Sequence, residues 1–114
     1  MHTFANIEPH LYHRLNNKSC NLKKNILLTI IDAPGYMSSE QIYYHLVGKC
    51  VISGKEKYSS ENFPKVVGST AGFPFISRKQ NTKQDNYIQE FCFNVKYNDI
   101  KSEIRKYIED YRCP

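Results

Sequence analysis

Apolar residues recur at helical spacing in the first half of the chain. They form one stripe with the period of an amphipathic helix, which predicts a helix over residues 21–32. The stripe consists of Leu22, Ile26, Leu27, Ile30 and Ile31. Pro34 and Gly35 follow directly and should end the helix. Proline disfavours the helical region in the preceding residue, and glycine accepts a turn.

Two shorter helices are expected next. Ser38 with Gln41 three residues later is typical of a capping box, which predicts a helix over residues 39–47. A third helix is predicted over residues 61–70. Residues 51–52 lie between these two helices and should loop out or add a short strand against a later hairpin. The side chains expected to face inward are Ile42, Tyr43 and Leu46, followed by Phe63, Val66 and Val67.

A β-hairpin is predicted after the third helix. Residues 73–78 and 87–95 alternate between two faces and are rich in aromatic residues, which is the pattern of strands. The connection, about residues 80–86, is wholly polar and is expected to be a loop longer than a tight hairpin needs. Arg78 and Lys79 make the base of this loop basic. One face of the return strand should hold Tyr87, Gln89, Phe91, Phe93 and Val95, and the other Ile88, Glu90, Cys92 and Asn94.

The end of the chain carries another strong helical pattern, an amphipathic helix over residues 98–112. Such a helix either covers the core of its own chain or pairs with a copy of itself. We favour pairing, because a terminal helix after a hairpin wing is a recurrent dimer element and a dimer doubles the contact with DNA. The expected dimerisation residues are Ile100, Ile104, Tyr107, Ile108 and Tyr111.

Helix, turn, helix and then a basic hairpin is the order of a winged helix. The predicted fold class is therefore α+β, a winged helix-turn-helix with a C-terminal amphipathic helix. A chain of 114 residues, 40% of them hydrophobic, has room for one domain. We expect residues 1–18 to be irregular or a short helix, residues 19–96 to form the winged-helix core, and residues 98–112 to form the final helix.

Positive charge is concentrated in one quarter of the chain. The formal net charge is +5, and residues 55–83 hold six basic and two acidic side chains. We expect these cations to converge on one outward surface made by the third helix and the hairpin, as phosphate binding requires. The alternative is an ordinary solvated surface. The expected DNA-binding residues are Lys55, Lys57, Asn62, Lys65, Ser69, Arg78, Lys79 and Lys83.

The sequence offers little support for metal, cofactor or catalytic chemistry. Its four cysteines form no CxxC pair, so we expect free thiols and neither a metal nor a cofactor. No phosphate-binding loop, GxSxG, HExxH or glycine-rich dinucleotide turn is present, so we do not expect an enzyme. No apolar run reaches the ~18 residues of a membrane span. The first residues lack a signal-peptide pattern, which favours a cytoplasmic location without membrane contact.

Residues 26–46, ILLTIIDAPGYMSSEQIYYHL, resemble the opening helices of winged helix-turn-helix regulators, including the ferric uptake regulator group. In that group an apolar helix, a proline-glycine turn and a capped helix recur. The hairpin, FPFISRK…YIQEFCFNV, is similar to the wing of small enterobacterial activators of the carnitine-operon regulator type. The His and Cys clusters that bind metal in the ferric uptake group are absent from this sequence, so metal sensing is not implied. The resemblance implies a sequence-specific transcription regulator.

The expected function is sequence-specific binding of double-stranded DNA by a homodimeric transcription regulator. Asn62 and Lys65 would read base edges, while the wing would meet phosphates. The alternative is a protein-interaction module on a winged-helix scaffold, such as a phage or mobile-element inhibitor of a host complex, since fold does not fix function. Its contact surface would consist of exposed aromatic residues, namely Tyr36, Tyr43, Tyr44 and Tyr58.

Overall fold

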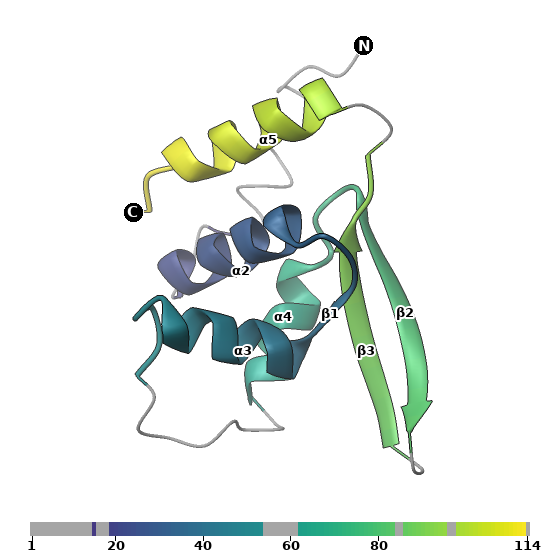
Figure 1. Ribbon diagram of the computed structural model, residues 1–114. Coiled ribbons are helices and arrows are strands. Elements are labelled where there is room, and N and C mark those ends of the chain that lie inside the picture. Colours follow the sequence, from purple (N-terminus) through teal and green to yellow (C-terminus); the bar gives the residue numbers. More distant parts are fainter. Residues whose placement is uncertain (1–14, 16–18, 54–61, 84–85, 96–97, 114) are drawn as a thin grey trace.

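The computed structural model describes residues 15, 19–53, 62–83, 86–95 and 98–113. The α+β class is confirmed, with helices and a small antiparallel sheet (Figure 1). In chain order the elements are α2 (Cys20–Asp32), β1 (Met37–Ser38), α3 (Ser39–Gly48), α4 (Asn62–Thr70), β2 (Ile76–Lys83), β3 (Asn86–Phe93) and α5 (Asn98–Asp110). The irregular or helical segment expected before residue 19 lies, apart from residue 15, outside the described residues.

Helix α2 confirms the first predicted helix and ends where Pro34 predicts. The Ala33 N–H donates to the carbonyls of Thr29 and Ile30, at 3.1 and 3.4 Å. Ala33 itself is extended, as the residue before a proline prefers. At the other end, Ser19 has a φ of 74° and its side chain makes no capping hydrogen bond. The start of α2 is therefore not set by a side-chain cap.

Helix α3 begins with the predicted capping box. The Gln41 N–H donates to Ser38 Oγ at 3.2 Å, and the Ser38 N–H donates to Gln41 Oε1 at 2.9 Å. Two backbone donors at the helix start are thus satisfied by two side chains. Ile42, Tyr43 and Leu46 are buried, which confirms the predicted inner face.

The three strands form one sheet in the order β1-β3-β2, so β3 is the central strand. β2 pairs with β3 over the full eight residues of both strands. β1 adds only two pairs, Met37 with Phe91 and Ser38 with Glu90. The hairpin therefore has a long partner on one side and a very short one on the other.

Of the two alternatives for residues 51–52, the structure shows the loop and not the short strand. The N–H groups of Val51 and Ile52 donate to the Leu46 carbonyl, so this segment folds back on the end of α3 and adds no strand. Met37 and Ser38 form the strand instead. Ser38 has a φ of −79° and a ψ of 164°, so the extended backbone that suits a helix cap also suits a strand.

The polar loop predicted over residues 80–86 is also wrong in length. β2 reaches Lys83 and β3 begins at Asn86, and each residue from Gln80 to Lys83 has a partner on β3. This end of the hairpin extends past the helices (Figure 1). Hydrogen bonds between the two backbones continue the strands through this polar segment. Its residues show no alternation of apolar and polar side chains, which is why the sequence indicated a loop.

Helix α2 is the centre of the hydrophobic core. It contacts α3, α4, α5 and β3. Its fully buried side chains are Ile26, Leu27, Ile30 and Ile31. The elements around it contribute Leu46, Val67, Phe91, Ile104 and Ile108, among others.

Helix α5 covers the core of its own chain. It lies along α2 (Figure 1). Ile104 and Ile108 are 1% and 0% exposed, while Ile100, Tyr107 and Tyr111 are partly buried against the same core. The prediction that this stripe forms a dimer interface is therefore wrong for Ile104 and Ile108. Burying apolar surface on α2 stabilises a single chain by roughly 25 cal/mol per Å² and needs no second copy.

Three links hold α5 on α2. They join Cys20 to Cys113 by a disulfide, Lys24 Nζ to the Tyr111 carbonyl at 2.8 Å, and Asp32 to Arg105 at 2.7 Å. The residues of α2 meet α5 and the residues just after it in reverse chain order, so the two helices run antiparallel.

The expectation of four free thiols is wrong for Cys20 and Cys113, whereas Cys50 and Cys92 are free. The bonded pair is separated by 93 residues, so no local motif announces it. Because disulfides are rare in the cytosol, this bond does not support the expected cytoplasmic location, which stays a prediction. Within the described ranges, no helix combines the length and the apolar character of a membrane span.

Cys113→Ser should lower the free energy of unfolding by about 4 kcal/mol. A disulfide that closes a loop of this length removes much of the entropy of the unfolded chain. The measurement is urea denaturation without reductant, followed by circular dichroism. Cys50→Ser, at an exposed free thiol, is the control and should leave the curve unchanged. Identical curves for Cys113→Ser and the wild type would mean that the bond does not form.

Asp32→Asn should destabilise the protein near neutral pH but not in acid. The hydrogen bond from Arg105 lowers the pKa of Asp32 below its ordinary value of 3.8. The carboxylate therefore stabilises the fold above pH 3.8, and this contribution is lost as the pH falls through the lowered pKa. Both side chains are about 40% exposed, so the difference should stay below ~1 kcal/mol. Urea denaturation across a pH series measures this difference, and Glu103→Gln, at an exposed position of α5, is the control. A difference in free energy of unfolding between Asp32→Asn and the wild type that does not change with pH would contradict the prediction.

Candidate nucleic-acid interface

Helix α4 presents one apolar and one polar face. Phe63 and Val67 are buried and Val66 packs partly buried against the core, as predicted. Thr70 is fully buried, and its Oγ1 donates to the Val66 carbonyl at 2.7 Å. The exposed positions are Asn62, Lys65 and Ser69. These are the three α4 residues that the sequence predicts to contact DNA.

Arg78 closes the C-terminal end of α4. Three of the last helical carbonyls accept backbone N–H groups from the turn that follows, namely those of Val67, Ser69 and Thr70. The remaining one, the Gly68 carbonyl, accepts from Arg78 Nη2. A helix leaves its last carbonyls without partners inside the helix, and a cation there also suits the helix dipole. Arg78 therefore has a structural role in joining β2 to α4.

Arg78 and Lys79 lie on opposite faces of the hairpin, as neighbouring strand residues must. The Arg78 guanidinium stands 5.6 Å from the centre of the Phe91 ring, on the inner face of the sheet. Lys79 Nζ stands 4.3 Å from the centre of the Tyr36 ring, on the outer face. The two cations are thus engaged with aromatic rings on different sides.

The expected convergence of cations is therefore only partly met. The structure brings Arg78 to the end of the helix that carries Lys65, but it directs Lys79 elsewhere. Lys83 lies in the last pair of the hairpin ladder, opposite Asn86. Lys55 and Lys57 lie outside the described residues. The roles of all these cations in DNA binding stay predictions.

The charge around α4 and β2 is of one sign. From Asn62 to Lys83 the sequence contains four basic residues and no acidic one. Helix α5, by contrast, mixes both signs, with Asp99, Glu103, Glu109 and Asp110 among its lysines and arginine. A surface built by α4 and β2 would therefore attract an anion more than the surface of α5 would.

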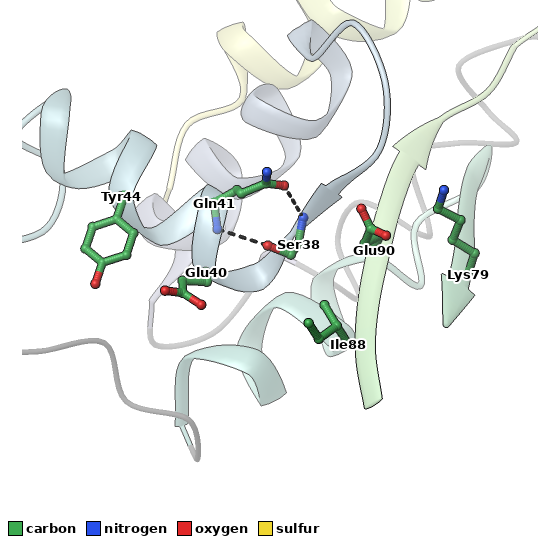
Figure 2. Close-up of a pocket in the computed structure, with 7 residues that line it drawn as sticks. All are labelled: Ser38, Glu40, Gln41, Tyr44, Lys79, Ile88 and Glu90. Atoms are coloured by element: carbon green, nitrogen blue, oxygen red, sulfur yellow. Dashed lines mark hydrogen bonds between the residues drawn. The ribbon is translucent and has the colours of Figure 1, made fainter. Parts of the chain in front are cut away.

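A second feature, which sequence reasoning missed, is a pocket of about 500 Å³ that Lys79 helps to line. Figure 2 shows α3 on one side of it and β3 on the other. Its lining residues are Ser38, Glu40, Gln41, Tyr44, Lys79, Ile88 and Glu90. Only the pairing of β1 with β3 brings these segments together, so no local sequence signal could have located the pocket.

The aromatic surface expected for a protein partner is smaller than predicted. Tyr36 and Tyr44 are 40% and 55% exposed. Tyr43 is only 6% exposed and packs edge-on against Phe63, at 5.3 Å between ring centres. Its burial agrees with its predicted place on the inner face of α3, and its inclusion in the aromatic contact surface is wrong. Tyr58 lies outside the described residues.

The chain matches no protein-family model, no curated protein and no solved structure. Within the described part of the chain, no three His, Cys, Asp or Glu residues gather in a way that could hold a metal ion. The site must therefore be interpreted from its own geometry and charge.

Arg78→Ala should lower the free energy of unfolding by about 1 kcal/mol. It removes the hydrogen bond to the Gly68 carbonyl and the contact with the Phe91 ring, each of modest value at an exposed position. Lys65→Ala, which removes a cation from the exposed face of α4, should stay within ~0.5 kcal/mol of the wild type. Urea denaturation compares the two. Equal effects of both substitutions would show that Arg78 does not secure the end of α4.

Proposed function

We propose that this protein is a winged-helix transcription regulator that binds double-stranded DNA. Helix α4 would enter the major groove, and the β2–β3 hairpin would act as the wing beside it. The observation that carries the proposal is the exposed face of α4, with Asn62, Lys65 and Ser69, in a segment without acidic residues up to Lys83.

The order of the elements supports this proposal. A helix and a short strand precede two further helices, and a hairpin follows them, with β1 pairing back onto β3. This layout is compatible with a winged helix, in which a hairpin stands beside a helix-turn-helix. The connection between α3 and α4 is longer than the three or four residues of a compact helix-turn-helix turn, and its central part lies outside the described residues.

The side chains on α4 suit contact with DNA. An asparagine can make two hydrogen bonds to adenine, and a lysine can donate to the acceptor atoms of guanine. Lys83, near the far end of the hairpin, would meet the phosphate backbone. Arg78 is committed to the Gly68 carbonyl, so its main contribution would be to hold the wing at the end of α4.

Action as a homodimer is a separate part of the proposal. The apolar stripe of α5 cannot supply the interface while Ile104 and Ile108 are buried on α2. A dimer would therefore have to form through another surface. Sedimentation or size-exclusion measurements with and without DNA distinguish a monomer from such a dimer.

Lys65→Glu should weaken DNA binding at least about tenfold more than Lys106→Glu. Both substitutions change the net charge equally, but Lys65 lies on α4 and Lys106 on the exposed side of α5. The measurement is fluorescence anisotropy with a labelled duplex of about 30 base pairs at ~50 mM salt. Basic domains bind duplexes without sequence specificity at about 1–100 µM at physiological salt and more tightly at this lower salt. Thermal unfolding of each variant checks that both remain folded.

Two results would overturn the proposal. One is the absence of binding to any duplex in this concentration range, and the other is an equal loss of affinity in both variants. If binding is found, the logarithm of the association constant should fall linearly with the logarithm of the salt concentration, because binding releases counterions from the phosphates. Selection from a random duplex pool would then identify the preferred sequence.

A further inference from the structure

The central strand of the sheet is paired on its β1 side at only two of its eight residues. β3 pairs with β2 at all eight of its residues, but with β1 only at Glu90 and Phe91. β1 then ends, because the chain turns into α3 at Ser39. Residues 86–89 of β3 therefore have no strand beside them on this side among the described elements.

The backbone groups at this open edge can be assigned. The Asn94 N–H donates to the Phe75 carbonyl at 2.7 Å, in continuation of the β2–β3 register. In an antiparallel ladder every second residue directs both its N–H and its C=O to the same neighbour. Phe91, Gln89 and Tyr87 therefore direct theirs away from β2. Phe91 meets Met37 of β1, whereas Gln89 and Tyr87 point to the open side.

The pocket lies beside this open edge. It is bounded by Ser38, where β1 ends, and by Ile88 and Glu90 of β3 (Figure 2). Glu40 and Tyr44 of α3 form the facing wall. An extended peptide paired with β3 in line with β1 would place every second side chain in or over this recess.

We propose that the open edge of β3 and the adjoining pocket bind an extended, positively charged peptide segment of a partner protein by strand addition. Backbone hydrogen bonds to Gln89 and Tyr87 would provide the pairing. The pocket would take one Arg or Lys side chain of the peptide, with its aliphatic part against Ile88 and Tyr44.

Charge complementarity selects a positively charged occupant. Two carboxylates, Glu40 and Glu90, line the pocket together with one cation, Lys79. That cation is already placed over the Tyr36 ring. The pocket thus has a net negative charge on a chain whose formal charge is +5, so it is a local exception to the charge of the molecule.

The other edge of the sheet does not offer the same site. β2 is the other outer strand of the sheet in the described part of the chain, and it carries Arg78, Lys79 and Lys83. Cations along an edge strand discourage pairing with another chain, and they would repel a basic peptide. Strand addition is therefore expected at β3 and not at β2.

The test uses a phage-displayed library of random peptides of about nine residues, selected on the wild-type protein in the absence of DNA. Enriched peptides should alternate β-branched residues with others and carry Arg or Lys at one position. Fluorescence anisotropy then measures their affinity for two proline variants. Gln89→Pro removes an N–H from the open edge and should weaken binding at least about tenfold.

Gln80→Pro is the matched control. Gln80 lies opposite Gln89 in the register and directs its N–H to the solvent side of β2. It should retain wild-type peptide affinity, and because neither proline removes a β2–β3 hydrogen bond, both variants should remain folded. Lys65→Ala, which changes the proposed DNA surface on α4, should retain wild-type peptide affinity, and this result would separate the two sites.

A charge test completes the design. Glu40→Lys should weaken the selected peptides about tenfold, whereas Glu103→Lys, the same charge change on α5, should not. The proposal is overturned if no peptide is enriched, if the enriched peptides lack an excess of Arg and Lys, or if they bind Gln89→Pro as tightly as the wild type.

Discussion

The burial of α2 is the constraint on which the rest of the structure depends. α3, α4 and β3 pack against this helix, and α5 packs against it as well. The proposed DNA surface on α4 and the C-terminal helix share no residue, yet α2 positions both. A substitution that creates a cavity at Ile26 or Ile30 would therefore disturb the two regions together, since a packed core transmits such changes.

Arg78 fixes the position of the hairpin against α4, the helix of the proposed DNA surface. Its guanidinium has five N–H donors in a rigid plane. One of them is bound to the Gly68 carbonyl, and the plane stands near the Phe91 ring. The hairpin and α4 are thereby fixed relative to each other, which would lower the entropy lost if DNA binds as proposed.

Local patterns in the sequence predicted the helices well, because periodicity and capping depend on near neighbours. α2, α3 and α4 began and ended within a residue of prediction, and Ser38 with Gln41 formed the expected capping box. β1 was missed because two residues cannot show an alternation. The amphipathic pattern of α5 indicated that its apolar stripe is buried, but not that α2 covers it. Of the site, the exposed face of α4 was predictable, whereas the pocket was not, since it depends on the pairing of β1 with β3.

The link between Cys20 and Cys113 changes the connectivity of the molecule. Residues 20–113 form a closed covalent ring that contains every element of the sheet and all four described helices. Hydrolysis of one peptide bond inside that ring would open it without dividing the molecule. A protease that cuts once between residues 20 and 113 would leave a nicked protein whose mass has grown by one water. The two parts of the nicked protein would separate only after reduction.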